Sequence, residues 1–433
     1  MRRQILPEIT EKLPYEIREI VAVAEEIQEL GQDIVWENIG DPVAKGEATP
    51  DWIKSIVKEA AGQDSSYAYS PTKGIFKTRE FLAQRHNQRS ETKLTANNIL
   101  FFNGLGDAIS NIYSHLHREA RVIGPDPTYP THAAAEAAHT AAPPITYRLD
   151  PSSGWQIDLS DLEEKLAANE DIVAILLVDP GNPTGVCFRA EILRGVVELA
   201  SQYDCFIISD EIYSDLRYGE AETERITDFL GDVPAVVLRG LSQVVPWPGS
   251  RCGWIEVYNT ENHADFAAYF DELVAAKTQE VCSTTLPQLV IPQIFTDDRW
   301  DGHLSGRNQA YEARAELLMD TLGDVAGLEV VKPNGAYYAS LVFTDGVLTD
   351  KQMLPIKNNE IAAVIAPLLK DGPLDKRFTY FLLAAEGICV VPLSSGFHSQ
   401  YYGFRLTLLE RDEEKFINML QHIKRAVEMY LAS

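Results

Sequence analysis

The chain is poor in cysteine and in positive charge, and each shortage excludes a class of protein. Its five cysteines are scattered and odd in number, which argues against a disulfide framework and suggests reduced thiols in a cytosol. Its 38 lysines and arginines are outnumbered by 64 acidic residues, so the net charge is −26. Such an acidic chain repels nucleic acid phosphates and anionic membranes, and we expect neither as a partner.

Long apolar runs and metal-ligand spacings are also missing from the sequence. The longest apolar run, residues 172–178, is far too short to span a bilayer and suits a buried strand. The first seven residues lack the apolar stretch of a secretory signal. His115 and His117 lie two positions apart, which on a helix points them to different faces, so we expect a solvated pair and no metal site. These observations favour a cytoplasmic protein.

A length of 433 residues exceeds what one core comfortably fills, so two subdomains are expected. The hydrophobic content of 45% and the charged content of 24% are ordinary for a soluble enzyme. Short apolar segments predict strands at residues 100–102, 171–178, 205–208 and 236–238. Longer segments predict helices at residues 15–30, 158–169, 261–282 and 307–323.

One predicted strand leads through glycines into a helix. Residues 103–108 read Asn-Gly-Leu-Gly-Asp-Ala, directly after the strand at 100–102. Backbone N–H groups at such a turn face outward, and the helix N-terminus adds a partial positive charge. Gly104, Leu105 and Gly106 therefore form a candidate phosphate cup, with an ordinary tight turn as the alternative. A dinucleotide site is not indicated, since it needs a further glycine and a downstream acid.

Polar residues follow two of the predicted buried strands. Asn182 stands in the run Asn-Pro-Thr-Gly after the strand at 171–178, where the proline fixes the backbone. Asp210 follows the strand at 205–208, and Tyr213 comes three residues later. Burying an acid at a strand end is costly unless a cationic group meets it. The cationic group that meets Asp210 is expected to be either a basic side chain of the protein, in a salt bridge, or a bound ligand.

Residues 239–254 carry the most specific pattern in the chain. Ser242, Gly249, Arg251 and Gly253 fall on the signature Ser-Lys, five residues, Gly, any residue, Arg, any residue, Gly. The chain thereby resembles the aspartate/alanine aminotransferase family (class I/II), fold type I of the pyridoxal 5'-phosphate enzymes. Position 243 departs from it, because Gln243 stands where the family has the lysine that forms the Schiff base and shuttles the proton. An amide nitrogen is not basic and can do neither.

The resemblance implies a cofactor-binding role for each matching residue. Asp210 would meet the protonated pyridine nitrogen and keep the ring an electron sink. Asn182 and Tyr213 would share the phenolic oxygen, and Tyr129, after Pro-Thr, would stack on the ring. Arg251 would hold the phosphate with its forked donors, beside the cup at 104–106 and Ser242.

The resemblance also implies substrates and a partner. Arg405, in Phe-Arg-Leu-Thr near the C-terminus, would clamp the carboxylate of an amino acid or 2-oxo acid, and Gly40 would line the pocket with backbone. Tyr69 would cross a dimer interface to the neighbour's phosphate, so a homodimer is expected. The implied fold is α/β, with a large cofactor-binding domain at residues 45–290 around a mostly parallel sheet. Residues 1–44 and 291–433 would form a smaller α/β domain.

Two further departures concern the C-terminal half. The family's Pro-Gly-Ser before an aromatic residue is Pro-Leu-Ser-Ser-Gly-Phe here, at residues 392–397. The segment at 345–376 is longer than the family leads us to expect. It contains a predicted helix at 358–369 and is a candidate to cover the site or contact a partner.

Three hypotheses account for Gln243. It is a substitution introduced into a working aminotransferase to trap a complex; or it is native, in a non-catalytic cofactor-binding protein or regulator; or it is native, in an enzyme that uses another base. Tyr69 and Lys73 are the nearest alternative bases. Because the other motif residues are present, we favour an aminotransferase whose activity Gln243 impairs. The cofactor would be pyridoxal 5'-phosphate, held non-covalently, or pyridoxamine 5'-phosphate.

Overall fold

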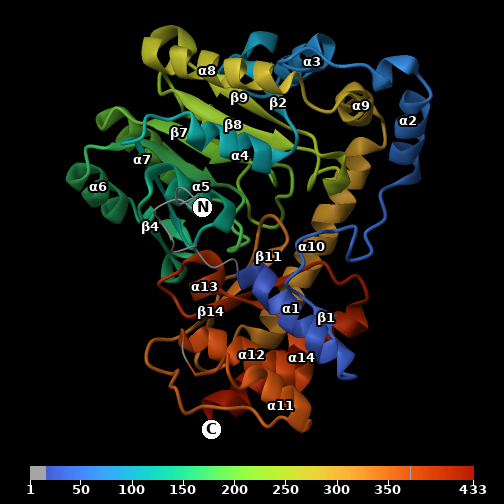
Figure 1. Cartoon of the computed structure of the whole chain (residues 1–433), viewed down its shortest axis with the longest axis vertical. Coiled ribbons are helices and arrows are strands. Elements are labelled where there is room, and N and C mark those ends of the chain that lie inside the picture. Colours follow the sequence, from blue (N-terminus) through green and yellow to red (C-terminus); the bar gives the residue numbers. More distant parts are fainter. Residues whose placement is uncertain (1–15, 371) are drawn as a thin grey trace, which may run out of the picture.

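The computed structural model describes residues 16–370 and 372–433, arranged in two lobes joined by a long helix (Figure 1). The larger lobe is built on an eight-stranded sheet of order β2-β9-β8-β7-β6-β3-β4-β5. Its strands are β2 (Ile99–Phe102), β3 (Arg121–Asp126), β4 (Ile145–Asp150), β5 (Gln156–Ile157), β6 (Ile172–Val178), β7 (Phe206–Asp210), β8 (Ala235–Gly240) and β9 (Gly253–Tyr258). β9 runs antiparallel to β2 and β8, and β5 runs antiparallel to β4. The remaining neighbours are parallel.

Both faces of this sheet are covered by helices, which is why its central strands are apolar along their whole length. Ile207 packs with one face and Ile208 with the other, as the alternation along a strand requires. One face carries α4 (Leu105–Ser114), α5 (Pro130–Thr140) and α8 (Ala264–Glu280). The other carries α2 (Asp51–Ala61), α3 (Phe76–Asn87), α6 (Leu159–Ala168), α7 (Ala190–Gln202) and α9 (Thr285–Thr296).

The smaller lobe has an antiparallel sheet of order β10-β11-β14-β13 and a second core. Its strands are β10 (Leu328–Val330), β11 (Tyr338–Phe343), β13 (Val391–Pro392) and β14 (Gly403–Thr407). Its helices are α1 (Glu16–Glu29), α11 (Asn359–Ile365), α12 (Leu374–Glu386), α13 (Leu393–Phe397) and α14 (Glu413–Leu431). β1 (Val35–Trp36) pairs with β12 (Ile388–Cys389), so the N-terminal segment joins the C-terminal third (Figure 1). The domain boundaries at residues 45 and 290 stay a prediction.

Helix α10 (Trp300–Leu322) connects the two lobes (Figure 1). Trp300 at its start packs into the core of the large lobe, and Leu318 near its end packs into that of the small lobe. The helix begins seven residues before the predicted start at 307. Its buried positions fall at helical spacing, but Arg307 occupies one of them and interrupts the apolar stripe.

The segment at 345–376 packs on the small lobe. Leu354, Ile361 and Ile365 are buried in its core, and Met353 N donates to the Ser433 hydroxyl at 3.0 Å. Its helix is shorter than the predicted 358–369, because α11 ends at Ile365 and a tight turn follows. α11 lies at the far end of the molecule from the large sheet (Figure 1).

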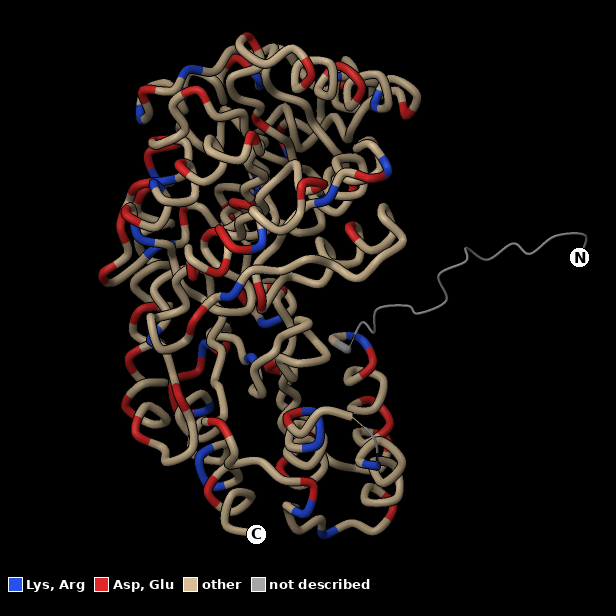
Figure 2. Tube along the Cα trace, turned by 90° about the vertical axis from the view of Figure 1, so that its left-hand side faces the viewer, with Lys and Arg blue, Asp and Glu red and all other residues tan. Residues whose placement is uncertain are grey.

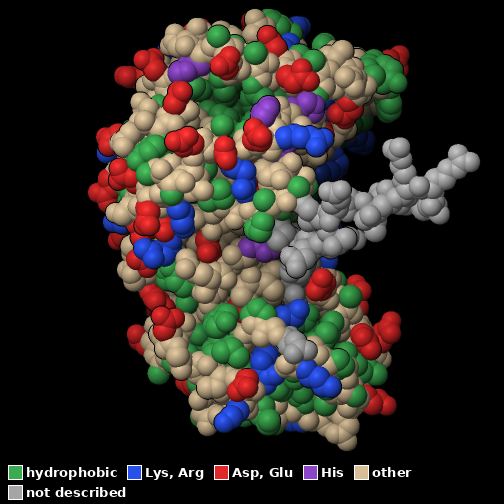
Figure 3. All heavy atoms as spheres, turned by 60° about the vertical axis from the view of Figure 1, so that its left-hand side comes forward, with side chains coloured by type: hydrophobic (Ala, Val, Ile, Leu, Met, Phe, Trp, Pro, Cys, Tyr) green, Lys and Arg blue, Asp and Glu red, His purple; other side chains and the backbone are tan. Residues whose placement is uncertain are grey.

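The charge pattern agrees with the acidic composition. Acidic residues are spread along the trace of both lobes in Figure 2, and on the face seen in Figure 3 acidic side chains lie over both lobes. Within residues 16–370 and 372–433, no helix is long and apolar enough to cross a membrane. α4 ends at Ser114, so His115 caps it and His117 lies beyond it, and the described residues form no cluster suited to a metal ion.

Candidate active site

The predicted site residues gather where the parallel strands of the large sheet end. The carboxyl ends of such strands lie at one edge, so the residues after β6, β7 and β8 become neighbours. The backbone ties them together: Asp179 N donates to Asp210 O and Glu211 N to Leu238 O, both at 3.0 Å. Asn182, Asp210 and the 239–254 segment thus share one edge.

Asp210 meets a histidine rather than an arginine or lysine. Its side chain is buried, and Oδ2 lies 3.1 Å from His132 Nε2 at the start of α5. The His132 Nδ1 lies 3.3 Å from the Tyr113 hydroxyl of α4. A neutral imidazole with its proton on Nε2 satisfies both contacts, donating to the carboxylate and accepting from the phenol. The histidine thereby orients the Asp210 carboxyl group. Sequence reasoning missed His132.

Asn182, Tyr213 and Arg405 are brought together from both lobes. Arg405 in β14 is 2% exposed, and its Nη1 donates to Asn182 Oδ1 at 3.3 Å. The Tyr213 hydroxyl lies 2.9 Å from that of Tyr338 in β11, and burial raises the pKa of Tyr213. The Arg405 guanidinium lies 4.7 Å from the centre of the Tyr338 ring. The lone arginine noted near the C-terminus is therefore buried between the two lobes and is not a surface residue.

Arg405 and its neighbour Asn38 also have unused hydrogen-bonding atoms. The Arg405 Nε and the Asn38 Oδ1 are buried and have no hydrogen-bond partner among the described residues. Arg405 Nη2 is held by the Asn38 carbonyl, so the guanidinium is fixed while part of its fork stays available. Buried polar atoms without partners are costly, and they mark places where a ligand can complete the hydrogen bonding.

The glycine turn forms a cradle beneath Arg251. Gly104 caps α4 with φ of 87°, a conformation that favours glycine. A Cβ at Gly104 would lie 2.8 Å from Cζ of Arg251, so the guanidinium sits directly against the turn. Arg251 is exposed, and with the described residues its guanidinium makes only long hydrogen bonds, from Nη1 to Pro248 O and from Nη2 to Asn103 O. A cation beside a helix N-terminus is an arrangement that binds anions.

Gln243 is held at this edge by residues from the other lobe. Its Oε1 accepts a hydrogen bond from the Tyr337 hydroxyl, which also lies 2.9 Å from Gly40 O. Arg307 Nη1 donates to the carbonyls of Gln243 and Val244, both at 2.8 Å. The backbone of the signature segment is therefore fixed by α10. Tyr337 and Arg307 carry no motif that the sequence analysis could have recognised.

The remaining predicted residues differ in how closely they approach the site. A Cβ at Gly40 would lie 3.3 Å from Cζ of Tyr338, so only glycine leaves room there. Tyr129 caps α5, and its ring centre is 6.5 Å from that of His132. Ser242 is half-buried next to Gln243. Tyr69 is 84% exposed, so its ring packs against little of its own chain.

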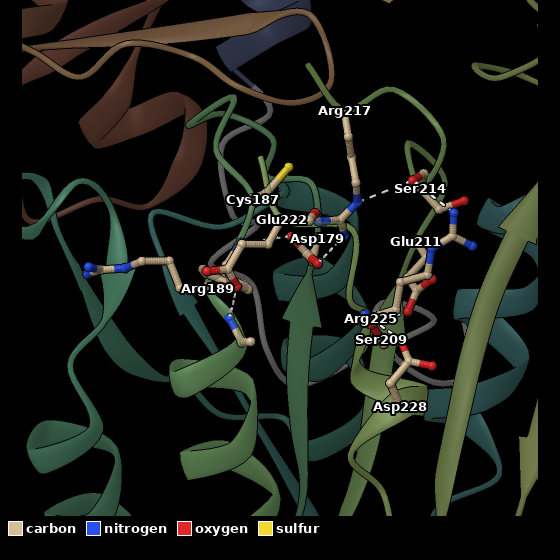
Figure 4. Close-up of polar contacts among 12 residues, drawn as sticks. Asp179, Cys187, Arg189, Ser209, Glu211, Ser214, Arg217, Glu222, Arg225 and Asp228 are labelled. Atoms are coloured by element: carbon tan, nitrogen blue, oxygen red, sulfur yellow. Dashed lines mark hydrogen bonds and ion pairs between the residues drawn. The ribbon is translucent and has the colours of Figure 1, made fainter. Parts of the chain in front are cut away.

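A buried ion pair supports the loops that carry Asn182 and Tyr213 (Figure 4). Asp179 follows β6 and Arg217 follows Tyr213, and their charged atoms are 2.5 Å apart. Asp179 Oδ1 also accepts from Phe188 N at 3.0 Å, and Arg217 Nε donates to Ser214 O at 3.3 Å. Burial alone would lower the pKa of Arg217, but the Asp179 carboxylate beside it raises that pKa above its ordinary value.

Comparison with known proteins identifies the class. Residues 34–423 match the aminotransferase class I and II family, and the chain belongs to it. Members of this family use pyridoxal phosphate and act on amino acid and 2-oxo acid substrates. The predicted family and fold type I architecture are thus confirmed.

Two relatives and one structure show the range of similarity. An uncharacterized aminotransferase of Methanocaldococcus jannaschii is 47% identical over 431 residues, covering 100% of both chains. The glutamate-pyruvate aminotransferase AlaA of Escherichia coli K12 is 27% identical, over 76% of this chain and 80% of its own. An alanine aminotransferase structure from Pyrococcus furiosus has a TM-score of 0.83 at 24% identity, covering 98% of this chain and 99% of its own. At that identity the structure speaks for the fold alone.

Proposed function

We propose that this chain binds pyridoxal 5'-phosphate without a covalent link and transfers amino groups between an amino acid and a 2-oxo acid at a rate that Gln243 reduces. The observation that carries the proposal is the Asn182–Arg405 contact, which joins a buried carboxylate clamp to the strand-end asparagine. The unused Arg405 Nε and Asn38 Oδ1 lie where a ligand can complete their hydrogen bonding.

The residues present fit the cofactor, apart from position 243. Arg251 and the backbone at Gly104, Leu105 and Gly106 would hold the phosphate, because glycine leaves the guanidinium free to lie against the turn. Asp210, oriented by His132, would face the pyridine nitrogen. The residues proposed to complete the site are Asn182, Tyr213, Tyr129 and Ser242, with Tyr69 from a second copy. When bound, the cofactor supplies an electron sink.

The carboxylate clamp narrows the substrate class. Arg405 is buried and always charged, so it favours a ligand with a carboxylate, which it can meet through two parallel hydrogen bonds. The relatives named for alanine and for glutamate and pyruvate favour alanine and glutamate as the first amino donors to test. Gly40 would contribute backbone to the same pocket.

Gln243 decides what the chain can do with such a substrate. The lysine position carries an amide, which cannot accept a proton at neutral pH. Its Oε1 is already engaged by Tyr337, and burial raises the Tyr337 pKa, so that phenol is a poor base. Lys73 is no better suited to act as the base. Its Nζ donates to Asn97 O and lies 4.8 Å from the centre of the Phe270 ring.

A non-catalytic cofactor-binding protein or regulator is the second candidate, and the engaged Gln243 side chain favours it. An enzyme using another base is the third, with Tyr69 of a second copy as the remaining candidate. The proposed setting is a homodimer in the cytoplasm. Its five free cysteines agree with a reducing compartment. Sedimentation of the cofactor-loaded chain would test the dimer, and a stable monomer would contradict it.

The decisive experiment compares the parent chain with Gln243→Lys. Equilibrium dialysis should show one pyridoxal 5'-phosphate per chain for both proteins. After borohydride reduction, mass spectrometry should find the cofactor attached only to the lysine variant. Transamination of alanine or glutamate should rise by a factor of about 10²–10⁴, the usual contribution of a positioned general base. Gln243→Met is the matched control and should stay unattached and slow.

Two results would change the conclusion. If Gln243→Lys attaches the cofactor but stays inert across a broad amino acid panel, the non-catalytic candidate replaces the aminotransferase. If the parent chain binds no cofactor at all while it remains folded, both fail.

A further inference from the structure

A second cavity lies behind the strand ends, on the opposite side of the sheet from Asp210. Its volume is about 540 Å³, within the usual range for small-molecule sites. It is bounded by the end of α3, the loop at 214–228 and the strands β8 and β9; we call it the α3 cavity. Glu211 lines it, whereas Asp210, one residue earlier, faces His132 on the other side.

Most of the buried charges around the α3 cavity are already paired. Arg239 lies 2.8 Å from Glu211 and 3.0 Å from Glu256, so two carboxylates surround one guanidinium. Arg225 is 2.5 Å from Asp215. Figure 4 shows Glu211 and Arg225 close to the end of β7, on the loop side. These pairs stabilise the walls and leave no unpaired buried carboxylate for a cation.

Two arginines on the α3 wall differ from these pairs, the half-buried Arg85 and the exposed Arg89. Neither has a carboxylate within ion-pair distance among residues 16–370 and 372–433. Arg85 lies 4.8 Å from the centre of the Phe295 ring and makes one long hydrogen bond, 3.5 Å, to the Phe295 carbonyl. Burial and the nearby Arg89 and Arg225 lower the pKa of Arg85, and Asp215 and Asp301 compensate its charge only in part. An oxyanion placed between the two guanidinium groups would compensate it.

Ser90 provides an independent indication at the same wall. It is 9% exposed and lines the α3 cavity, and its hydroxyl has no hydrogen-bond partner in the described part of the chain. A buried hydroxyl without a partner is costly. His86 beside it is different, because its two ring nitrogens already contact Thr92 O and the Tyr258 hydroxyl. Ser90 is therefore the free donor.

We propose that the α3 cavity binds a small molecule bearing an oxyanion group, a carboxylate or a phosphate, held by Arg85, Arg89 and the Ser90 hydroxyl. Glu224 and Asp228 are exposed acids at the cavity and exclude large polyanions. The loop that forms the outer wall carries Ser214, which accepts from Arg225 through its carbonyl. A ligand bound in the α3 cavity would therefore stabilise the loop at 214–228, which begins next to Tyr213. The proposal does not depend on Gln243.

The test must separate this cavity from the active site, which also has two anion-binding arginines. We would titrate full-length Arg251→Gln/Arg405→Gln protein with succinate and, separately, with inorganic phosphate, using isothermal titration calorimetry. One equivalent of at least one probe should still bind. Adding Arg85→Gln should weaken that binding about tenfold or more, and Ser90→Ala should weaken it several-fold, because each removes a donor to a charged group.

Arg194→Gln, added to the same background, is the matched control. Arg194 also stacks its guanidinium on an aromatic ring, 4.6 Å from the centre of Phe229, but it does not line the α3 cavity. It should leave both titrations unchanged, and thermal melts should show that all variants are folded. Binding of phosphate alone or succinate alone would identify which oxyanion the site takes. Failure of both probes to bind would overturn the proposal, and so would an Arg85→Gln variant that binds as tightly as the Arg194→Gln control.

Discussion

Removing Arg217 should destabilise the large lobe more than any surface change, because it leaves a buried carboxylate without its partner. The Arg217 and Asp179 side chains are 9% and 3% exposed, and their charged atoms are 2.5 Å apart. Arg217 also donates to the carbonyls of Ser214 and Glu222. Breaking such a pair from one side costs about 3–5 kcal/mol. Arg217→Met should therefore lower the free energy of unfolding by this amount.

The assay is urea unfolding followed by tryptophan fluorescence, at one pH and one ionic strength. Asp179→Asn/Arg217→Met should recover part of the loss, because the asparagine carries no charge and can still accept from Phe188 N. The coupling between the two sites should be about 1–3 kcal/mol. Arg189→Met is the control: its pair with Glu191 is 50% and 68% exposed, so it should cost less than about 1 kcal/mol.

Arg217→Met should also weaken cofactor binding, since Ser214 adjoins Tyr213 on the loop that this pair anchors. A variant within about 1 kcal/mol of the parent chain would refute the reasoning. So would a double variant no more stable than Arg217→Met, because the cost would then come from lost packing rather than from the uncompensated charge.

Three further predictions concern the site and its surroundings. Gly104→Ala should weaken pyridoxal 5'-phosphate binding at least about tenfold in dialysis, because its Cβ would displace Arg251, whereas Gly106→Ala meets nothing within 4 Å and should not. Burial raises the pKa of Asp126 to about 6, so its contribution to stability is lost as the pH rises from about 4 to about 6, on the order of 3 kcal/mol. Asp126→Asn should flatten the urea midpoint over that range, and an unchanged slope would contradict this. Arg405→Gln should weaken amino acid binding to the cofactor-loaded chain by about 2–5 kcal/mol, and an unaltered titration would show another role.

The sequence predicted structure best where a pattern of neighbouring residues also determines which side chains are buried. The apolar stripe at 15–30 became α1 (Glu16–Glu29), because its buried face is continuous. Asp210 could be singled out because an acid after an apolar strand needs an explanation. His132 could not, since it stands among alanines in α5 and gains its role only when that helix packs on the sheet. Its partner lies 78 residues away.

Residues contributed by the connecting helix and the small lobe were equally hidden. Arg307 looked like the start of a helix, yet it is an inward-facing side chain whose partners are the Gln243 and Val244 carbonyls. Tyr337 and Tyr338 read as a small-lobe strand, and only the packing of the lobes brings them to Gly40 and Tyr213. Contacts of this kind depend on how two cores dock, which no local pattern encodes.

The structure adds a physical argument to the question of Gln243. If the segment around residue 243 no longer had a function, its supports would be expected to loosen. Instead Arg307, 7% exposed, still fixes the backbone at residue 243, and its ion pair with Glu47 joins α10 to the segment before α2. The same guanidinium also donates to the Val244 carbonyl and the Tyr311 hydroxyl, so it ties the 243–244 backbone to α10. The backbone at residue 243 is therefore held in place by contacts from α10, as the proposed cofactor site requires. A glutamine at this position changes the chemistry of one side chain, while Arg307 still holds the backbone that presents it.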